Sequence, residues 1–239
     1  MLANRFKQVL NLVISDSQSA FVPRRLITDN VLVAFKALHY MKSKRKGRST
    51  HMAVKLDMSK AYDRVEWDFL KIMMLKLGFD RRWVHLIMQC LTTVSYSVIL
   101  NGEPTGYIKP TKGIHQGDPL SPYLFLICAE CLTALLRQAE VSGPIQGLSI
   151  CCGGPHISHL FFADDSLLFC RATMVECRNL LATLDTYEQA SCQKLNHDKT
   201  SLFFSSNTHP DTRRAICTKL RSTSIGDLGK YLGLPPFPQ

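Results

Sequence analysis

The sequence predicts an α+β fold, in which helices and strands are mixed without the strict strand–helix–strand alternation of a parallel sheet. Two observations lead to this prediction. Apolar residues recur at helical spacing in residues 2–14, 67–77 and 121–140, whereas residues 52–56 and 201–204 show the short apolar patterns of strands. No internal repeat or low-complexity tract interrupts these elements. We therefore expect a small antiparallel sheet with helices packed on it.

The chain has 239 residues, enough to bury a substantial core as one large domain or two subdomains. Its 46% hydrophobic and 20% charged residues are typical of a globular protein rather than a disordered one. No apolar run reaches the ~18 residues that a membrane span needs, and the N-terminus lacks the hydrophobic core of a signal peptide. We expect an intracellular protein with no membrane partner.

The net charge of +10 is held in one half of the chain. Residues 1–120 carry 19 Lys and Arg against 9 Asp and Glu, whereas residues 121–239 carry 10 against 10. Such an excess indicates a surface that binds a polyanion. The densest cluster is Lys42–Arg48, for which direct nucleic-acid contact, a solvated loop and a nuclear-import patch are the alternatives.

Nine cysteines in a chain without a secretion signal are expected to be reduced thiols. Cys128 and Cys131 have metal-ligand spacing, and Cys151 and Cys152 are the candidates to complete a zinc site. However, the first pair lies in an apolar helical stretch, and two adjacent cysteines are a poor second half for such a site. We therefore expect no zinc site.

The N-terminal elements are helices separated by polar segments. Residues 2–14 form an amphipathic helix, and Thr28 or Asp29 is expected to cap a second helix that runs to about Lys42. The inward residues of this second helix are expected to be its large apolar ones, namely Val31, Leu32, Phe35 and Leu38. The basic loop that follows leads into the strand at residues 52–56.

The middle of the chain combines helices with a hairpin. A helix that starts near Trp67 ends at Gly78, and Asp80 begins another that runs to about Leu91. Asn101-Gly102, between β-prone runs, indicates a hairpin at about 95–110.

A long helix opens the second half of the chain. Ser121 is expected as its cap and Pro122 as its first residue, with Gly143-Pro144 ending it near Glu140. The later elements are expected to be strands at 145–152 and 157–162, a helix spanning 175–187, a strand at 201–204 and a helix at 211–220.

Two adjacent carboxylates stand between apolar runs near the centre of the second half. Asp164 and Asp165 form the polar break between residues 157–162 and 167–170, a pattern that predicts a hairpin with acids at its tip. Burial of unpaired carboxylates beside apolar surface costs several kcal/mol or more, so a cation is expected there. The alternative is a solvated turn that happens to be acidic.

A second acid of this kind, Asp57, ends the strand at residues 52–56. Although 107 residues separate it from Asp164, the two strand ends are expected to meet on adjacent strands of one sheet. Oxygen donors without a matching His or Cys set suit Mg²⁺. Two such ions ~3.5–4 Å apart support nucleotidyl transfer.

Several ordered motifs extend this pattern over nearly the whole chain. They are Ser19–Pro23, Lys55–Trp67, Gln116–Phe125, Phe161–Phe169, Lys194–Thr200 and Tyr231–Leu234. With these motifs the sequence resembles the reverse transcriptases of plant LINE-type (non-LTR) retrotransposons. The resemblance implies a right-hand polymerase palm over residues 51–239, with a fingers-side hairpin at about 95–110 and a final primer-grip turn. It also implies partial fingers over residues 1–50, and the thumb of the family is not matched.

The resemblance assigns roles to the acidic residues and to one lysine. Asp57 and Asp164 hold two Mg²⁺ ions, or Mn²⁺, and Asp165 assists them. Lys199 lies near the leaving pyrophosphate as a catalytic residue.

The remaining roles implied by the resemblance concern the substrates. Tyr62 packs under the sugar of the incoming nucleotide, and Phe162 lies near the primer end. The other implied contacts are Gln116 and Gly117 with template and nucleotide, Arg24 and Arg25 with template or triphosphate, and Leu232 and Gly233 with the primer strand.

The implied function is RNA-directed DNA synthesis, in which deoxynucleotides are added to the 3′-hydroxyl of a DNA primer on an RNA template during retrotransposition. The location implied is the nucleus or a cytoplasmic ribonucleoprotein. One alternative is a catalytically inactive retrotransposon remnant that only binds nucleic acid. Another is a palm-fold nucleotidyl cyclase, which the Gln116-Gly117 loop and the basic N-terminal segment disfavour.

Overall fold

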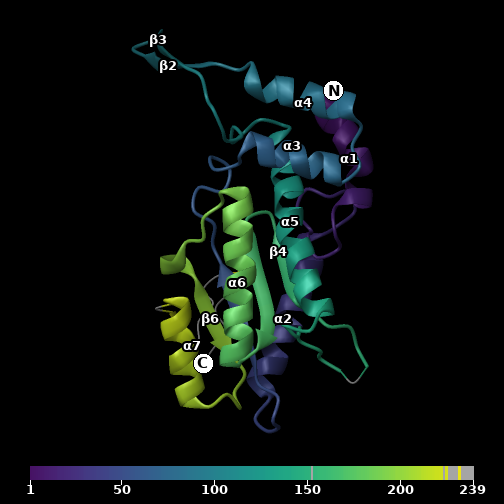
Figure 1. Cartoon of the computed structure of the whole chain (residues 1–239), viewed down its shortest axis with the longest axis vertical. Helices are drawn as coiled ribbons and strands as arrows, with labels where there is room; N and C mark the ends of the chain where they lie inside the picture. Colours follow the sequence, from purple (N-terminus) through teal and green to yellow (C-terminus); the bar gives the residue numbers. More distant parts are fainter. Residues whose placement is uncertain (152, 223, 226–230, 233–239) are drawn as a thin grey trace.

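The computed structural model describes residues 1–151, 153–222, 224–225 and 231–232. Within this part of the chain, five strands form one sheet in the order β4-β5-β1-β6-β7, and all neighbouring pairs are antiparallel except β6 and β7 (Figure 1). The strands are β1 (His51–Leu56), β4 (His159–Phe162), β5 (Asp165–Arg171), β6 (Ser201–Phe204) and β7 (Ser224–Ile225).

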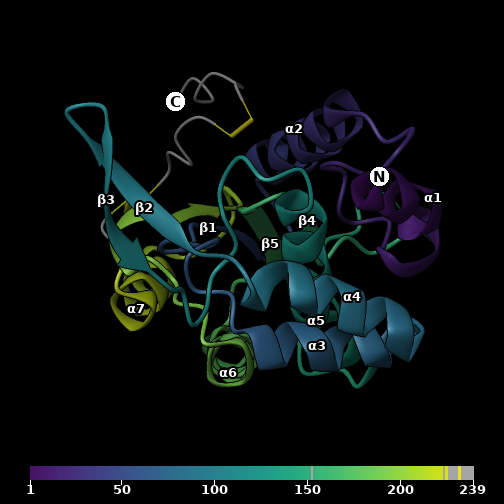
Figure 2. The same ribbon diagram turned by 90° about the horizontal axis from the view of Figure 1, so that it is seen from above.

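Helices cover both faces of the sheet, and α2 lies on the opposite face from α6 (Figure 2). They are α1 (Leu2–Val13), α2 (Ile27–Ser43), α3 (Trp67–Lys76), α4 (Arg81–Thr92), α5 (Ser121–Val141), α6 (Met174–Ser191) and α7 (Pro210–Leu220). None of the helices described here is long and apolar enough to cross a membrane.

The alternation of side chains along β1 divides the core into two layers. Met52, Val54 and Leu56 join the larger cluster with α1 and α3 to α7, whereas Ala53 joins the smaller cluster under α2. Because successive strand residues point to opposite faces, β1 is buried on both sides and forms the centre of the sheet.

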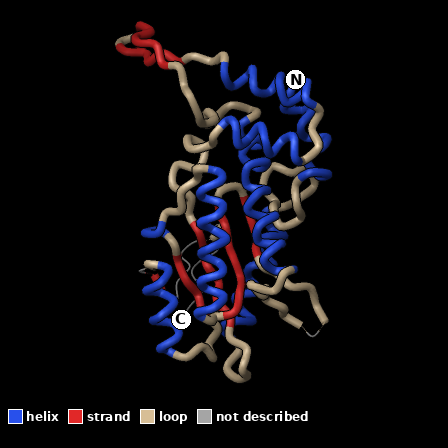
Figure 3. Tube along the Cα trace, in the orientation of Figure 1, coloured by secondary structure: helices blue, strands red, loops and turns tan. Residues whose placement is uncertain are grey.

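A hairpin of β2 (Tyr96–Leu100) and β3 (Glu103–Ile108) projects away from the rest of the protein (Figure 3). Asn101 and Gly102 at its tip have φ of 51° and 89°, as a tight hairpin turn requires. The hairpin expected at about 95–110 is therefore confirmed. Its exposed apolar residues include Val98, Ile99, Leu100, Tyr107 and Ile108.

The second helix differs from expectation in its start and in its buried face. It begins at Ile27, and its N-cap residue Leu26 makes no capping hydrogen bond, so neither Thr28 nor Asp29 caps it. Leu32 and Phe35 are exposed, so the expected inward face was wrong at these two positions. The buried residues are Asn30, Ala34, Ala37, Leu38 and Met41. Two alanines let the helix approach the sheet closely, and this contact selects the buried face.

The long helix α5 also begins differently. Leu120 is the N-cap, Ser121 is already helical, and Pro122 is its second residue. The carboxylate of Asp118 accepts a hydrogen bond from the Leu120 amide at 2.7 Å, so the turn before the helix is stabilised from outside it. The expected cap at Ser121 was therefore one residue too late.

The strand expected at 145–152 is not formed in its described residues. Only Leu148 pairs there, through two backbone hydrogen bonds of 2.9 Å with Ile157, and β4 starts at His159. The Ser149 hydroxyl donates to the carbonyls of Cys151 and Gly154, which closes a local turn. Local side-chain hydrogen bonds of this kind compete with extension of a sheet.

Candidate active site at the carboxylate end of the sheet

The register of β1 and β5 brings the acidic residues to one end of the sheet. Leu56 pairs with Ser166, so Asp57 follows β1 at the point where Asp165 begins β5. The β4–β5 hairpin places Asp164 in the turn beside them. The expectation that these strand ends meet on adjacent strands is confirmed.

Many of the predicted site residues line one cavity of about 670 Å³ at this end. They are Asp57, Tyr62, Gln116, Gly117, Asp164 and Lys199. The cavity wall also contains Phe21, Lys60 and Asp118, which the sequence analysis did not assign. Asp118 lies in the same polar loop as Gln116, and this was the only sequence signal for it.

The carboxylates have different surroundings. The pKa of Asp165 is raised by burial and by repulsion from Asp164 and Asp57, against the opposing effect of Lys55. Asp165 also raises the pKa of Tyr231, after the larger effect of burial. Leu167 and Phe169, which alternate along β5 with Asp165, belong to the cluster under α2, so Asp165 lies toward that side of the sheet, whereas Asp57 and Asp164 line the cavity.

Lys199 forms an ion pair with Asp57, with Nζ 3.7 Å from Oδ2. A backbone bond of 2.9 Å from the Asn196 amide to the Asp57 carbonyl ties the segment that carries Lys199 to the end of β1. Among the described residues, no three His, Cys, Asp or Glu side chains are arranged to hold a metal ion. The arrangement is an open, negatively charged site with an exposed lysine at its edge.

Tyr62 is an aromatic residue in the wall of the cavity. Its ring stacks on Phe125 of α5, with centroids 5.1 Å apart and planes 12° apart. Tyr62 lines the same cavity as Asp164, and burial, followed by the charge of this carboxylate, raises the pKa of the Tyr62 hydroxyl. The helix α5 thus fixes a rigid aromatic side chain beside the acids.

The loop with Gln116 and Gly117 is docked on the segment that contains Tyr62. The Gly113 amide donates to the Val65 carbonyl at 2.8 Å, and the Ile114 amide donates to the Tyr62 carbonyl at 3.0 Å. A Cβ at Gly113 would lie 2.9 Å from the Asp63 carbonyl oxygen, so glycine permits this approach. Gly117, with φ of 102°, likewise adopts a conformation that favours glycine.

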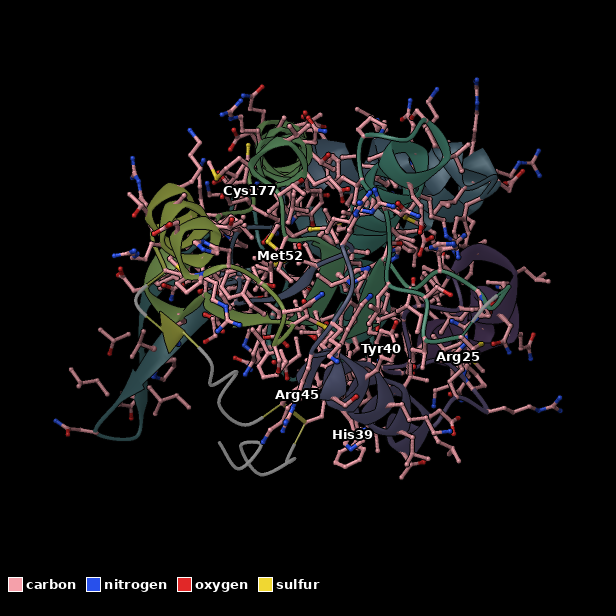
Figure 4. All side chains as sticks on the ribbon, turned by 90° about the horizontal axis from the view of Figure 1, so that it is seen from below. Arg25, His39, Tyr40, Arg45, Met52 and Cys177 are labelled. Atoms are coloured by element: carbon pink, nitrogen blue, oxygen red, sulfur yellow. The ribbon has the colours of Figure 1, made fainter. Side chains whose placement is uncertain are left out.

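Arg25, labelled in Figure 4, is engaged with the backbone and is not among the residues that line the cavity. Its guanidinium donates to the carbonyls of Ser15, Gln18 and Ile14 at 2.5, 2.7 and 2.9 Å. A contact between Arg25 and template or triphosphate therefore requires these bonds to be given up, and that role stays a prediction. Arg24 is exposed, with φ of 68°.

The other predicted substrate contacts lie at the edges of the site. Phe162 is half-buried at the end of β4, where it pairs with Asp165. Leu232 packs against the core under α2, and Gly233 lies outside the described residues. Gln18, which the sequence analysis did not identify, contacts the backbone of Ala163 beside Asp164. Only its place next to the Ser19–Pro23 motif pointed to it.

Comparison with known proteins gives several relatives from mobile elements. The Pol polyprotein of the type-1 retrotransposable element R2 of Popillia japonica is 32% identical over 161 residues, or 67% of this chain and 25% of that protein. The transposon TX1 149 kDa protein of Xenopus laevis is 28% identical over 98% of this chain, a match that spans 17% of that protein. An uncharacterized mitochondrial protein of Arabidopsis thaliana is 48% identical over 68 residues, or 28% of this chain and 56% of that protein. The chain thus spans only part of these relatives.

Solved structures with the same fold include two telomerases. Telomerase of Candida tropicalis, in complex with a fragment of telomeric RNA, has a TM-score of 0.60 at 13% identity, over 85% of this chain and 33% of that one. The Candida albicans telomerase has a TM-score of 0.59 at 14% identity, over 87% of this chain and 34% of that one. These likenesses show the α+β fold of a polymerase palm. A sequence profile of the family described as reverse transcriptase (RNA-dependent DNA polymerase) matches residues 1–235. The chain belongs to the reverse transcriptase family.

Proposed function

We propose that this domain catalyses RNA-templated DNA synthesis, adding deoxynucleotides to the 3′-hydroxyl of a DNA primer. One observation carries the proposal: Asp57 and Asp164, 107 residues apart, line a single cavity with Tyr62, Gln116 and Lys199. The acids can hold metal ions, and Tyr62 can contact the sugar of the nucleotide. Gln116 and Lys199 can contact the template and the phosphates, so one cavity offers the groups that a polymerase reaction uses. The family profile matches residues 1–235, which supports the same reaction.

The donor chemistry of the acids suits two divalent cations, Mg²⁺ or Mn²⁺, although no three of these side chains are arranged around one metal position in the described residues. The donors are all carboxylate oxygens, which hard cations prefer. Mutual repulsion contributes to the raised pKa of Asp165, so a cation between the acids relieves an existing electrostatic cost. Asp57 and Asp164 would hold the ions from the cavity side, and Asp165 would support them from behind. When bound, the ions lower the pKa of the attacking hydroxyl and neutralise phosphate charge.

The chain's other residues act on the nucleotide. Lys199 offers a mobile positive charge or a proton at the edge of the cavity, where the pyrophosphate would leave. Tyr62, held by Phe125, occupies the volume beside the sugar and excludes a 2′-hydroxyl. Gln116 offers a donor and an acceptor, and Gly117 allows backbone to approach the template base.

The partners implied by this reaction are an RNA template, a DNA primer and deoxynucleoside triphosphates. We propose a LINE-type element of plant origin as the source, since the motifs support it and an Arabidopsis thaliana protein is 48% identical over 68 residues. We propose action in the nucleus or in a cytoplasmic ribonucleoprotein, as the resemblance to LINE-type retrotransposons implies.

The rival functions make different demands on the site. A remnant that only binds nucleic acid needs the basic surface but not the acids. A nucleotidyl cyclase needs the acids but no template, and the Gln116-Gly117 loop at the cavity disfavours it.

Primer extension on an RNA template tests the proposal, with Asp164→Asn as the inactivating variant and Asp185→Asn as its control. Asp185 is an exposed acid on α6, away from the cavity. Parent and control should extend the primer, and Mg²⁺ should raise their melting temperatures. Asp164→Asn should extend the primer far less, and Mg²⁺ should raise its melting temperature far less. The substitution removes a ligand charge at nearly constant volume. Equal stabilisation by Mg²⁺ of parent and Asp164→Asn would contradict the assignment. Nucleic-acid binding without extension would favour the remnant.

A further inference from the structure

The connector between α1 and α2 runs beside the acidic hairpin as an additional edge segment. Gln18 and Phe161 form a parallel bridge. The Phe161 amide donates to the Ser17 carbonyl at 2.7 Å, and the Ser19 amide donates to the Phe161 carbonyl at 3.1 Å. Residues near the start of the chain therefore support a strand that lies far along the sequence.

The side chain of Gln18 binds the backbone of the turn itself. Its Oε1 accepts hydrogen bonds from the amides of Ala163 at 3.1 Å and Ala20 at 3.0 Å. Its Nε2 lies 3.5 Å from the Ala163 carbonyl oxygen. Gln18 is 2% exposed, so water does not replace these contacts.

Ala163 needs such a partner because its backbone is left-handed, with φ of 53°. Residues with a Cβ disfavour this conformation, and it persists where the surroundings enforce it. Asp164 is the next residue, so the conformation of Ala163 sets the direction in which the carboxylate leaves the turn. A relaxed φ at Ala163 would aim Asp164 elsewhere.

The connector is itself fixed to the palm by charged groups. Glu130 of α5 accepts from the backbone amide of Ser15 at 3.1 Å and from the Ser15 hydroxyl. Arg25 donates to three carbonyls of the same segment, including that of Gln18. These contacts hold the backbone that carries Gln18 in place, so its carboxamide has a fixed position relative to the turn.

We propose that Gln18 is a positioning residue that holds Ala163 in its left-handed conformation and so aims Asp164 into the cavity. The proposal deepens the proposed function, on which the role of Asp164 rests. Arg25 then serves the site indirectly, by holding the segment that carries Gln18.

Hydrogen exchange at the Ala163 amide tests the hydrogen bond between this amide and Gln18 without any ligand. In Gln18→Met, a residue of similar length that offers no acceptor of comparable strength, exchange at this amide should accelerate about tenfold or more relative to the parent. Ser205→Ala is the matched control, because the buried Ser205 hydroxyl accepts from the His51 amide at 2.9 Å, at the opposite end of β1. Ser205→Ala should lower the melting temperature but leave exchange at Ala163 unchanged.

Equal exchange at Ala163 in the parent and in Gln18→Met would overturn the proposal. Equal acceleration in Gln18→Met and Ser205→Ala would also overturn it, since it would reflect a general loss of stability. If Gln18→Met does not fold, the same comparison is made in the Ala163→Gly background. Glycine adopts positive φ without penalty, and the amide at position 163 still needs its acceptor.

Titration with Mn²⁺ or Mg²⁺ alone adds a second measurement, followed by melting temperature. Gln18→Met should weaken the apparent affinity for the metal about tenfold, whereas Ser205→Ala should not change it. A parent that shows no metal response would contradict the proposed function, and the exchange result would still decide the role of Gln18. A metal affinity in Gln18→Met equal to that of the parent would overturn the inference that the Gln18–Ala163 hydrogen bond directs Asp164 into the cavity.

Discussion

The ammonium nitrogen of Lys199 lies 3.7 Å from Oδ2 of Asp57, and both side chains reach solvent, with exposures of 69% for Lys199 and 36% for Asp57. An exposed pair of this kind contributes only about 0–1 kcal/mol to stability. Its position at the edge of the cavity is therefore better explained by ligand binding than by folding.

We predict that Lys199→Gln weakens binding of a deoxynucleoside triphosphate about tenfold, since it removes a positive charge near the expected pyrophosphate. The melting temperature should change little. Isothermal titration with one deoxynucleotide in Mg²⁺ provides the measurement. Lys194→Gln is the control, because the exposed Lys194 pairs with Glu188, at 3.1 Å, outside the cavity. Equal losses in both variants would show that Lys199 contributes only general charge.

For Tyr62, we predict a change in sugar discrimination. Tyr62→Val opens the volume beside the sugar, so incorporation of ribonucleotides relative to deoxynucleotides should rise about tenfold, or about 1.4 kcal/mol in kcat/KM. Single-nucleotide insertion on one RNA template measures the ratio. Tyr62→Phe should keep both the stack on Phe125 and the discrimination. A constant ratio with lower overall activity would make Tyr62 a packing residue.

The basic cluster Lys42–Arg48 lies at the opposite end of β1 from Asp57, about 20 Å away, because the strand contains six residues. Figure 4 views this end and labels Arg45. The loop is held in place by Asn207, whose amide nitrogen donates to the carbonyls of Gly47 and Ser49 at 3.0 and 3.1 Å. If nucleic acid contacts the cluster, it does so away from the carboxylates.

We predict that joint replacement of Lys44, Arg45 and Lys46 by Ala reduces the salt dependence of primer–template binding. The slope of log K against log salt should fall by about one for each phosphate that the variant no longer neutralises. The control replaces Lys71, Lys76 and Arg81 by Ala, which removes the same charge from α3 and α4. Identical slopes in both triple variants would assign the cluster to solvent or to nuclear import.

Stability should fall in mild acid because of His159. Burial, and then the charge of Arg137, lower the pKa of His159 to about 4. The unfolded chain binds a proton there below about pH 6.5, whereas the folded protein does so only below about pH 4. Between these values the unfolded state holds more protons, so the free energy of unfolding decreases as pH falls, by up to about 3 kcal/mol.

Denaturation by urea between pH 4 and pH 7 measures this dependence. His159→Gln should flatten it while lowering stability at neutral pH, since the ring nitrogens lie 2.9 and 3.0 Å from the hydroxyls of Ser17 and Ser158. His39→Gln, at an exposed position on α2, is the control and should keep the parent's dependence. A dependence unchanged in His159→Gln would show that other groups, such as buried His51, control the acid response.

Local patterns in the chain were sufficient for much of the fold. The helical spacing after Trp67, the Asn101-Gly102 turn and the apolar run before Asp57 each depend on residues that are close in sequence, and the structure has the corresponding elements. The position of each acid just after a strand was also sufficient to expect that the acids meet, because strand ends of one sheet share an edge.

Tertiary contacts decided what local patterns did not contain. The face of α2 that is buried depends on how closely the sheet approaches Ala34 and Ala37, and hydrophobicity alone favoured Leu32 and Phe35. Likewise, Asp165 is the first residue of β5 and shares the α2 side with Leu167 and Phe169, whereas Asp164 stays in the turn before the strand and lines the cavity.

Gln18 is the clearest example of a contact that local sequence patterns do not predict. Nothing in its neighbourhood indicates an interaction with Ala163, 145 residues away. A hydrogen bond between distant segments depends on where the whole fold places them, and a single side chain has no periodic pattern to reveal it. The sequence by itself determined which residues form most of the helices and strands and the acidic tip, since these follow from local periodicity. Only the tertiary structure decided which side chains hold that tip in place, because their partners are brought together by long-range packing.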